Sequence, residues 1–65
     1  MIYYRQDRIT KQLYRRSGNG SEEYVFNEQR WEHTSDAVEA FHDSSDTKQI
    51  TETEALAIIE TRIKK

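Results

Sequence analysis

The sequence predicts an α+β domain in which an antiparallel meander of three or four strands carries a C-terminal helix on one face. Three observations predict this fold. β-Branched and aromatic residues recur through the first half, both glycines (Gly18 and Gly20) stand between two strand-like segments, and an amphipathic segment follows Thr51. The 65 residues contain no segment long enough to act as a linker, so we expect a single small domain over residues 1–65.

The first half of the chain is typical of strands joined by tight turns. Residues 9–16 and 22–27 are strand-like, and the glycine and asparagine between them favour a hairpin turn. The polar residues 28–30 predict a second turn, which leads into a strand over residues 31–34. Residues 2–5 form a further strand or extend the one that follows, with residues 6–8 as the turn. The expected sheet is therefore a meander.

The second half is typical of helices. Ser35 or Asp36 is expected to cap a short helix near residues 36–42, followed by a polar loop over residues 43–49. Thr51 and Glu54 have the spacing of a capping box, which predicts a helix from there to the C-terminus. Helical spacing places a buried stripe on that helix, formed by Ala55, Leu56, Ile59 and Ile63 and widened by Ile58.

We expect a small core with Trp31 as its main anchor, because full exposure would leave its large apolar area in water. One face of the hairpin should receive the C-terminal helix, and the other should present aromatic rings and cations to solvent or to another molecule. The expected core residues are Ile9, Leu13, Val25, Trp31, Phe41, Leu56, Ile59 and Ile63.

Charge is strongly segregated along the chain although the formal net charge is only −2. Residues 1–16 hold five cations against one carboxylate, and residues 17–60 hold eleven carboxylates against two cations. Such asymmetry is a hint of an electrostatic partner surface. Part of it should be neutralised across the hairpin, where the cations of the first strand face Glu22 and Glu23.

These features favour a small non-enzymatic interaction or regulatory protein that acts by binding another protein. The alternative is a nucleic-acid-binding module that uses the basic, aromatic N-terminal hairpin, although a pI near 5.6 is unusual for that class. A third option is a homodimer formed through the second face of the hairpin. The candidate partner-binding residues are Tyr3, Tyr4, Arg5, Arg8, Tyr14, Arg15, Arg16, Tyr24 and Phe26.

The sequence indicates no catalytic, cofactor or metal site. His33 and His42 are the only histidines, there is no cysteine, and both glycines belong to the hairpin turn. Residues 43–54 resemble an EF-hand calcium loop at several positions, but Lys48 replaces the glycine that the sharp turn of such loops needs. The lack of cysteine and of a long apolar segment, together with the polar N-terminus, leads us to expect a cytoplasmic protein without a membrane partner.

Overall fold

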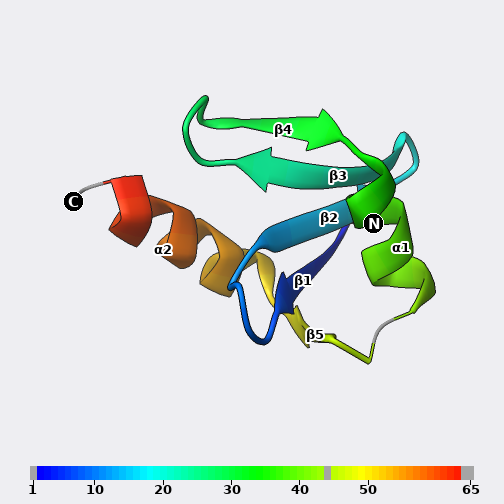
Figure 1. The fold of residues 1–65 in the computed structure, drawn as a ribbon. Helices are drawn as coiled ribbons and strands as arrows, with labels where there is room; N and C mark the ends of the chain where they lie inside the picture. The colour runs from blue at the N-terminus through cyan, green and yellow to red at the C-terminus, as the bar shows by residue number, and fades with distance from the viewer. Residues whose placement is uncertain (1, 44, 64–65) are drawn as a thin grey trace.

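The computed structural model of the protein describes residues 2–43 and 45–63 and confirms the α+β fold (Figure 1). Four strands form an antiparallel meander, and a fifth returns to the opposite edge, so the sheet has the order β4-β3-β2-β1-β5. The strands are β1 (Tyr3–Asp7), β2 (Leu13–Ser17), β3 (Gly20–Val25), β4 (Arg30–His33) and β5 (Thr47–Ile50). The helices are α1 (Ser35–His42) and α2 (Glu52–Ile63). None of the helices described is long and apolar enough to cross a membrane.

The hairpin between β2 and β3 lies where the sequence predicts it. Ser17 pairs with Gly20, and only residues 18 and 19 connect the two strands. Gly20 has a φ of +111°, a backbone conformation that glycine adopts without steric cost. The register that follows places Arg15 opposite Glu22, with which it forms an ion pair, as expected, whereas Glu23 lies opposite Tyr14 rather than a cation.

The loop between β1 and β2 corrects the expectation of a strand from residue 9. One carboxylate oxygen of Asp7 accepts hydrogen bonds from the backbone N–H groups of Ile9 and Thr10, both at 2.8 Å. Lys11 then takes a φ of +66°, which ends any extended conformation. As a result Ile9, an expected core residue, is 86% exposed at the tip of this loop.

The fifth strand corrects the expectation of a polar loop over residues 43–49. β5 pairs antiparallel with β1, so that Gln49 lies opposite Arg5 and Ile50 lies opposite Tyr4. The buried side chains of Thr47 and Ile50, at its two ends, attach this short strand to the rest of the protein. Its central residues, Lys48 and Gln49, are exposed, which gives the segment its polar character.

Both helices begin at threonine caps. The side chain of Thr34 accepts the N–H of Ala37 at 3.1 Å, so Thr34, rather than Ser35 or Asp36, caps α1. At α2 the capping box predicted from Thr51 and Glu54 is confirmed. The backbone N–H of Glu54 donates to Thr51 Oγ1 and that of Thr51 donates to Glu54 Oε1, both at 3.1 Å.

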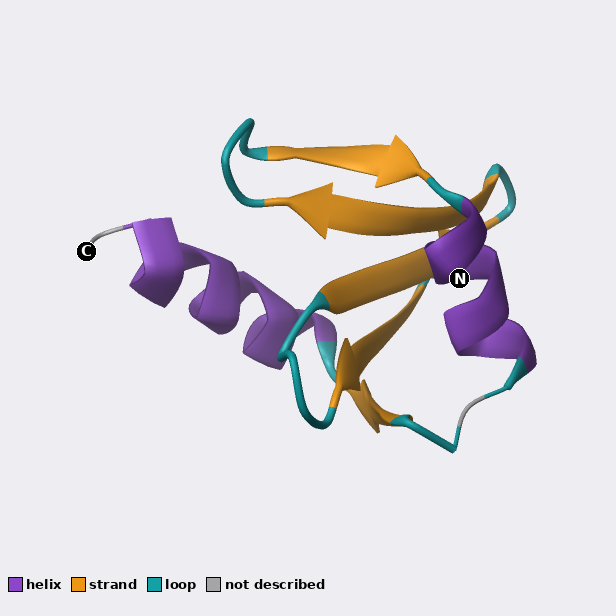
Figure 2. Cartoon of the chain, viewed as in Figure 1, coloured by secondary structure: helices purple, strands orange, loops and turns teal. Residues whose placement is uncertain are grey.

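The sheet lies between the two helices (Figure 2). Alternate residues of its strands face one helix or the other. The face that receives α2, called the α2 face below, carries the larger core. The face that receives α1, called the α1 face, carries a smaller one around Tyr14, Ala37 and Ala40, with Phe41 packed against it. The buried residues of the larger core are Tyr4, Leu13, Tyr24, Ile50 and Ala55.

The core differs from the expected one in its details. Leu13 is fully buried as predicted, whereas Leu56 is 55% exposed because α2 turns Ala55, Ile58 and Ile59 toward the sheet instead. Trp31 is only half-buried, since β4 is an edge strand. The expected core residues that are half-buried are Val25, Trp31, Phe41 and Ile59, and the side chain of Ile63 lies outside the described residues.

Candidate functional site

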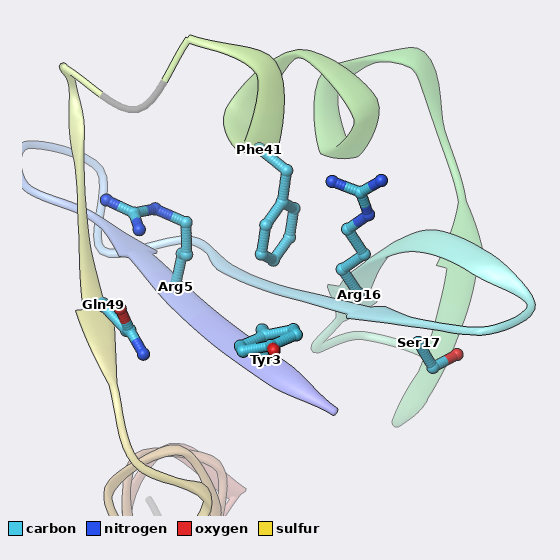
Figure 3. Close-up of a pocket in the computed structure, with 6 residues that line it drawn as sticks. All are labelled: Tyr3, Arg5, Arg16, Ser17, Phe41 and Gln49. Carbon is cyan, nitrogen blue, oxygen red and sulfur yellow. The ribbon is translucent and has the colours of Figure 1, made fainter. Parts of the chain in front are cut away.

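Four elements bring six residues together around an open pocket of about 370 Å³ on the α1 face. Pairing of Tyr3 with Arg16 and of Arg5 with Gln49 places these four side chains on one face of the sheet. Phe41 reaches down to them from the last turn of α1 (Figure 3). The residues of this arginine pocket are Tyr3, Arg5, Arg16, Ser17, Phe41 and Gln49.

Arg5 is held in place by hydrogen bonds to the neighbouring strand. Its Nε donates to Thr47 Oγ1 at 2.7 Å, and its Nη2 donates to the Thr47 carbonyl at 2.9 Å. Thr47 is itself buried and its hydroxyl contacts the carbonyl of Ala40 at 3.4 Å. Arg5 therefore links β1 to β5, and Thr47 links β5 to α1, so the positive charge in the pocket has a fixed position.

Arg16 differs from Arg5 because it is exposed. Within residues 2–43 and 45–63, no hydrogen bond or ion pair engages its guanidinium group. In Figure 3, Phe41 hangs between Arg16 and Arg5, and Tyr3 lies beneath its ring. Tyr3 is 48% exposed and Phe41 is half-buried, so the pocket offers aromatic surface as well as charge.

The opposite end of the α1 face is acidic. A smaller cavity of about 160 Å³ there is lined by Tyr14 and by five carboxylates, from Asp7, Asp36, Glu39, Asp43 and Asp46. Burial raises the pKa of the Tyr14 hydroxyl, and the negative charges of Glu23, Asp7 and Asp36 raise it further. Among the described residues no group of three acidic, histidine or cysteine side chains is arranged to hold a metal ion. The EF-hand resemblance has no support either, since Thr51 and Glu54 form the cap of α2.

The charge segregation of the sequence thus becomes a separation in space. Cations gather at one end of the α1 face and carboxylates at the other, with α1 covering the middle. Of the two ends of the α1 face, the arginine end is the one complementary to a ligand that carries a negative group next to an apolar one.

The remaining predicted site residues lie elsewhere. Tyr4, Tyr14 and Tyr24 are buried, with exposed fractions of 7%, 9% and 6%, Tyr4 and Tyr24 in the core of the α2 face and Tyr14 in that of the α1 face, so these three rings offer little surface to a partner. A homodimer through the second face of the hairpin stays a prediction, and α1 already packs on the Tyr14 side of the sheet.

Arg15 and Phe26 belong to the α2 face. Arg15 donates from Nε to Glu22 Oε1 at 2.7 Å, and its guanidinium carbon lies 4.5 Å from the centroid of the Trp31 ring. Phe26 packs against Tyr24, and Arg62 lies over its ring. Arg8 is exposed in the loop after β1, where its backbone N–H donates to the Asp46 carbonyl.

Sequence reasoning missed Ser17, which it placed in the hairpin turn, and also Phe41 and Gln49 as pocket residues. Phe41 was assigned to the core and Gln49 to a loop, and each reaches the pocket only through contacts between segments far apart in the sequence. Comparison with protein-family models, with curated proteins and with solved structures finds no match to this chain.

Proposed function

We propose that the chain is a small non-enzymatic protein that binds another protein, and that the arginine pocket receives an acidic side chain of that partner next to an apolar one. The observation that carries the proposal is the pair of arginines on either side of Phe41, above the exposed ring of Tyr3. Arginine and aromatic side chains are the residue types that most often dominate the binding energy of protein interfaces.

Two features of the pocket support binding rather than catalysis. Its lining includes neither a carboxylate nor a histidine, so no general base stands beside the hydroxyl of Ser17. Arg5 is already positioned by Thr47, so less side-chain entropy is lost when a partner's carboxylate binds to it. The proposal places the protein in the cytoplasm, whose reducing conditions suit a chain without cysteine.

A random-peptide display library tests the chemistry of the proposed partner. We expect selected sequences to be enriched in Asp or Glu next to an aromatic or aliphatic residue. Arg16→Gln should weaken binding of a selected peptide about tenfold, the order expected when a charge-assisted hydrogen bond is lost. Arg8→Gln is the matched control, because Arg8 is an exposed cation outside the pocket, and it should leave the affinity unchanged.

Two results would overturn this proposal. One is selection of peptides without acidic residues, and the other is equal loss of affinity in the Arg16→Gln and Arg8→Gln proteins. With a selected peptide, amide chemical shifts should change for Tyr3, Phe41 and Gln49 and not for residues of β4. The same two variants can serve as bait in an extract of the native host. A protein that binds at the pocket should be lost with Arg16→Gln and retained with Arg8→Gln, whereas a protein bound by nonspecific electrostatic attraction should be reduced with both.

Nucleic acid is the second candidate ligand, and one observation favours it. The exposed ring of Tyr3 and the half-buried ring of Phe41 could stack on unpaired bases beside two cations. Only Arg5 and Arg16 of the five N-terminal cations line the pocket, however, and Arg15 is paired with Glu22. We therefore expect single-stranded oligonucleotides to bind far more weakly than the selected peptides at low salt. Tight binding with a steep salt dependence would reverse the ranking.

A further inference from the structure

The outer edge of β4 is open. β4 pairs with β3 on one side only, and in Figure 1 no other described segment lies along its other side. An open edge presents unpaired backbone N–H and C=O groups, which can pair with another strand. Natural proteins often place charges there to prevent such pairing, and Arg30 and Glu32 are both exposed on β4.

The order of these charges is the same in both directions along the chain. Glu28, Arg30 and Glu32 alternate in sign, and Arg30 forms ion pairs with both of its acidic neighbours. Aligned on Arg30, this pattern meets an antiparallel copy of itself with like charges, whereas a register in which Arg30 faces Glu32 of the copy brings opposite charges together.

The register between two paired β4 strands decides whether opposite charges meet. In a two-fold symmetric antiparallel pair, one residue lies opposite its own copy, and facing residues share one face of the sheet. With Arg30 or Glu32 at the centre, that residue faces its own like charge. With Trp31 at the centre, Arg30 of each copy faces Glu32 of the other, which makes two favourable cross-strand pairs. Of the registers centred on Arg30, Trp31 or Glu32, only the one centred on Trp31 brings opposite charges together.

Trp31 adds an apolar contact in the same register. Its ring is half-buried, with its centroid 5.1 Å from that of Tyr24 and 6.1 Å from that of Tyr4, so part of its surface remains in water. Opposite its own copy it would bury more of that surface, and aromatic cross-strand pairs stabilise antiparallel sheets.

We propose that two copies of this chain associate through β4, antiparallel and centred on Trp31, to form one continuous sheet. Pairing of two four-residue strands buries less than the roughly 1,200 Å² typical of stable complexes, so the dimer forms reversibly and depends on concentration. The arginine pocket is built from β1, β2, β5 and α1 and stays open in this dimer, so the proposal is independent of the proposed function.

Charge reversal at β4 tests the register. Sedimentation equilibrium of the wild-type chain should show an average mass that rises with concentration from 7.8 kDa toward twice that value. Arg30→Glu and Glu32→Arg should each weaken association about tenfold, because each places two like-charge pairs at the interface. The double variant Arg30→Glu/Glu32→Arg gives positions 30 and 32 opposite charges again and should restore association.

Lys48→Glu, on the opposite edge strand β5, is the matched control and should leave the average mass unchanged. The three positions altered in these four variants are exposed on edge strands, and circular dichroism verifies that each variant is folded. A wild-type mass of 7.8 kDa at every concentration overturns the proposal. So does a double variant that associates no better than the single ones.

Discussion

The two faces of the sheet use the same residue types in opposite ways. On the α2 face, aromatic rings pack on one another and the cations lie against them, with Arg15 over Trp31 and Arg62 over Phe26. On the α1 face, Arg5 and Arg16 surround an open pocket, and carboxylates surround another at the far end. Tyrosine and arginine therefore support the core on one face and form a candidate binding site on the other.

The covering helix explains much of this difference. α1 has eight residues and buries two alanines, Ala37 and Ala40, which bring it close to Tyr14 but fill little space on either side. Pockets therefore remain at both ends of the helix. α2 instead packs Ala55, Ile58 and Ile59 against a sheet face already filled by aromatic rings. We infer that small residues on a short helix leave room for the arginine pocket.

Stability should depend far more on the α2 face, and the largest expected effect comes from its centre. Leu13 has no exposed surface, so Leu13→Ala leaves a cavity in the core and should lower the free energy of unfolding by about 2–5 kcal/mol. Phe41→Ala removes a larger side chain but one that is half-buried beside an open pocket, and it should cost less than Leu13→Ala. Urea denaturation of both variants measures the difference. An equal or greater loss for Phe41→Ala would show that the α1 face carries as much of the stability.

Removal of the threonine cap of either helix should have a smaller effect on stability, and the loss should differ between α1 and α2, which cover opposite faces of the sheet. Thr34→Ala and Thr51→Ala each remove a side-chain acceptor at a helix N-terminus and should each cost about 1 kcal/mol. The Thr34 hydroxyl also donates to Glu23 Oε1 at 3.0 Å, so Thr34→Ala should cost more than Thr51→Ala.

Thr34→Ser and Thr51→Ser are the matched controls for these caps, because serine keeps the hydroxyl, and both should retain most of the wild-type stability. Denaturant midpoints of the four proteins decide the order. If Thr51→Ala proved the more harmful change, the bond from Thr34 to Glu23 would contribute little.

The parts of the fold that the sequence predicted well are local. The turn at Gly18 and Gly20 and the capping box of Thr51 and Glu54 each depend on residues within a few positions of one another. β5 was missed because Lys48 and Gln49 at its centre are exposed, and only pairing with β1, more than forty positions away, makes it a strand. Ile9 was misplaced because the carboxylate of Asp7 captures the N–H groups that a strand would have used.

The residues of the candidate site were likewise predicted where the signal is local and missed where it depends on long-range packing. Tyr3, Arg5 and Arg16 were named from their position in a basic, aromatic segment, and they line one pocket. The same argument also named Tyr4 and Arg15, which point to the opposite face. Period-two alternation could have separated these two sets, but the choice of face for α1 and the arrival of β5 arise only from long-range packing.

The smallest expected effect concerns Asp7, which begins the loop that ends β1. Hydrogen bonds from the backbone N–H groups of Thr10 and Ile9 hold the pKa of its carboxyl below the ordinary value of 3.8. The folded state therefore binds this proton less tightly than the unfolded state does, so the ionised carboxylate stabilises the fold above pH 3.8. That contribution is lost as the pH falls through the lower pKa of the folded state.

Asp7→Asn keeps the side-chain oxygen but not the charge, so it should be less stable than wild type at pH 6, with the difference shrinking below pH 3.8. Urea midpoints of both proteins between pH 6 and pH 2 measure this, and a difference independent of pH would show that the charge of Asp7 does not stabilise the loop.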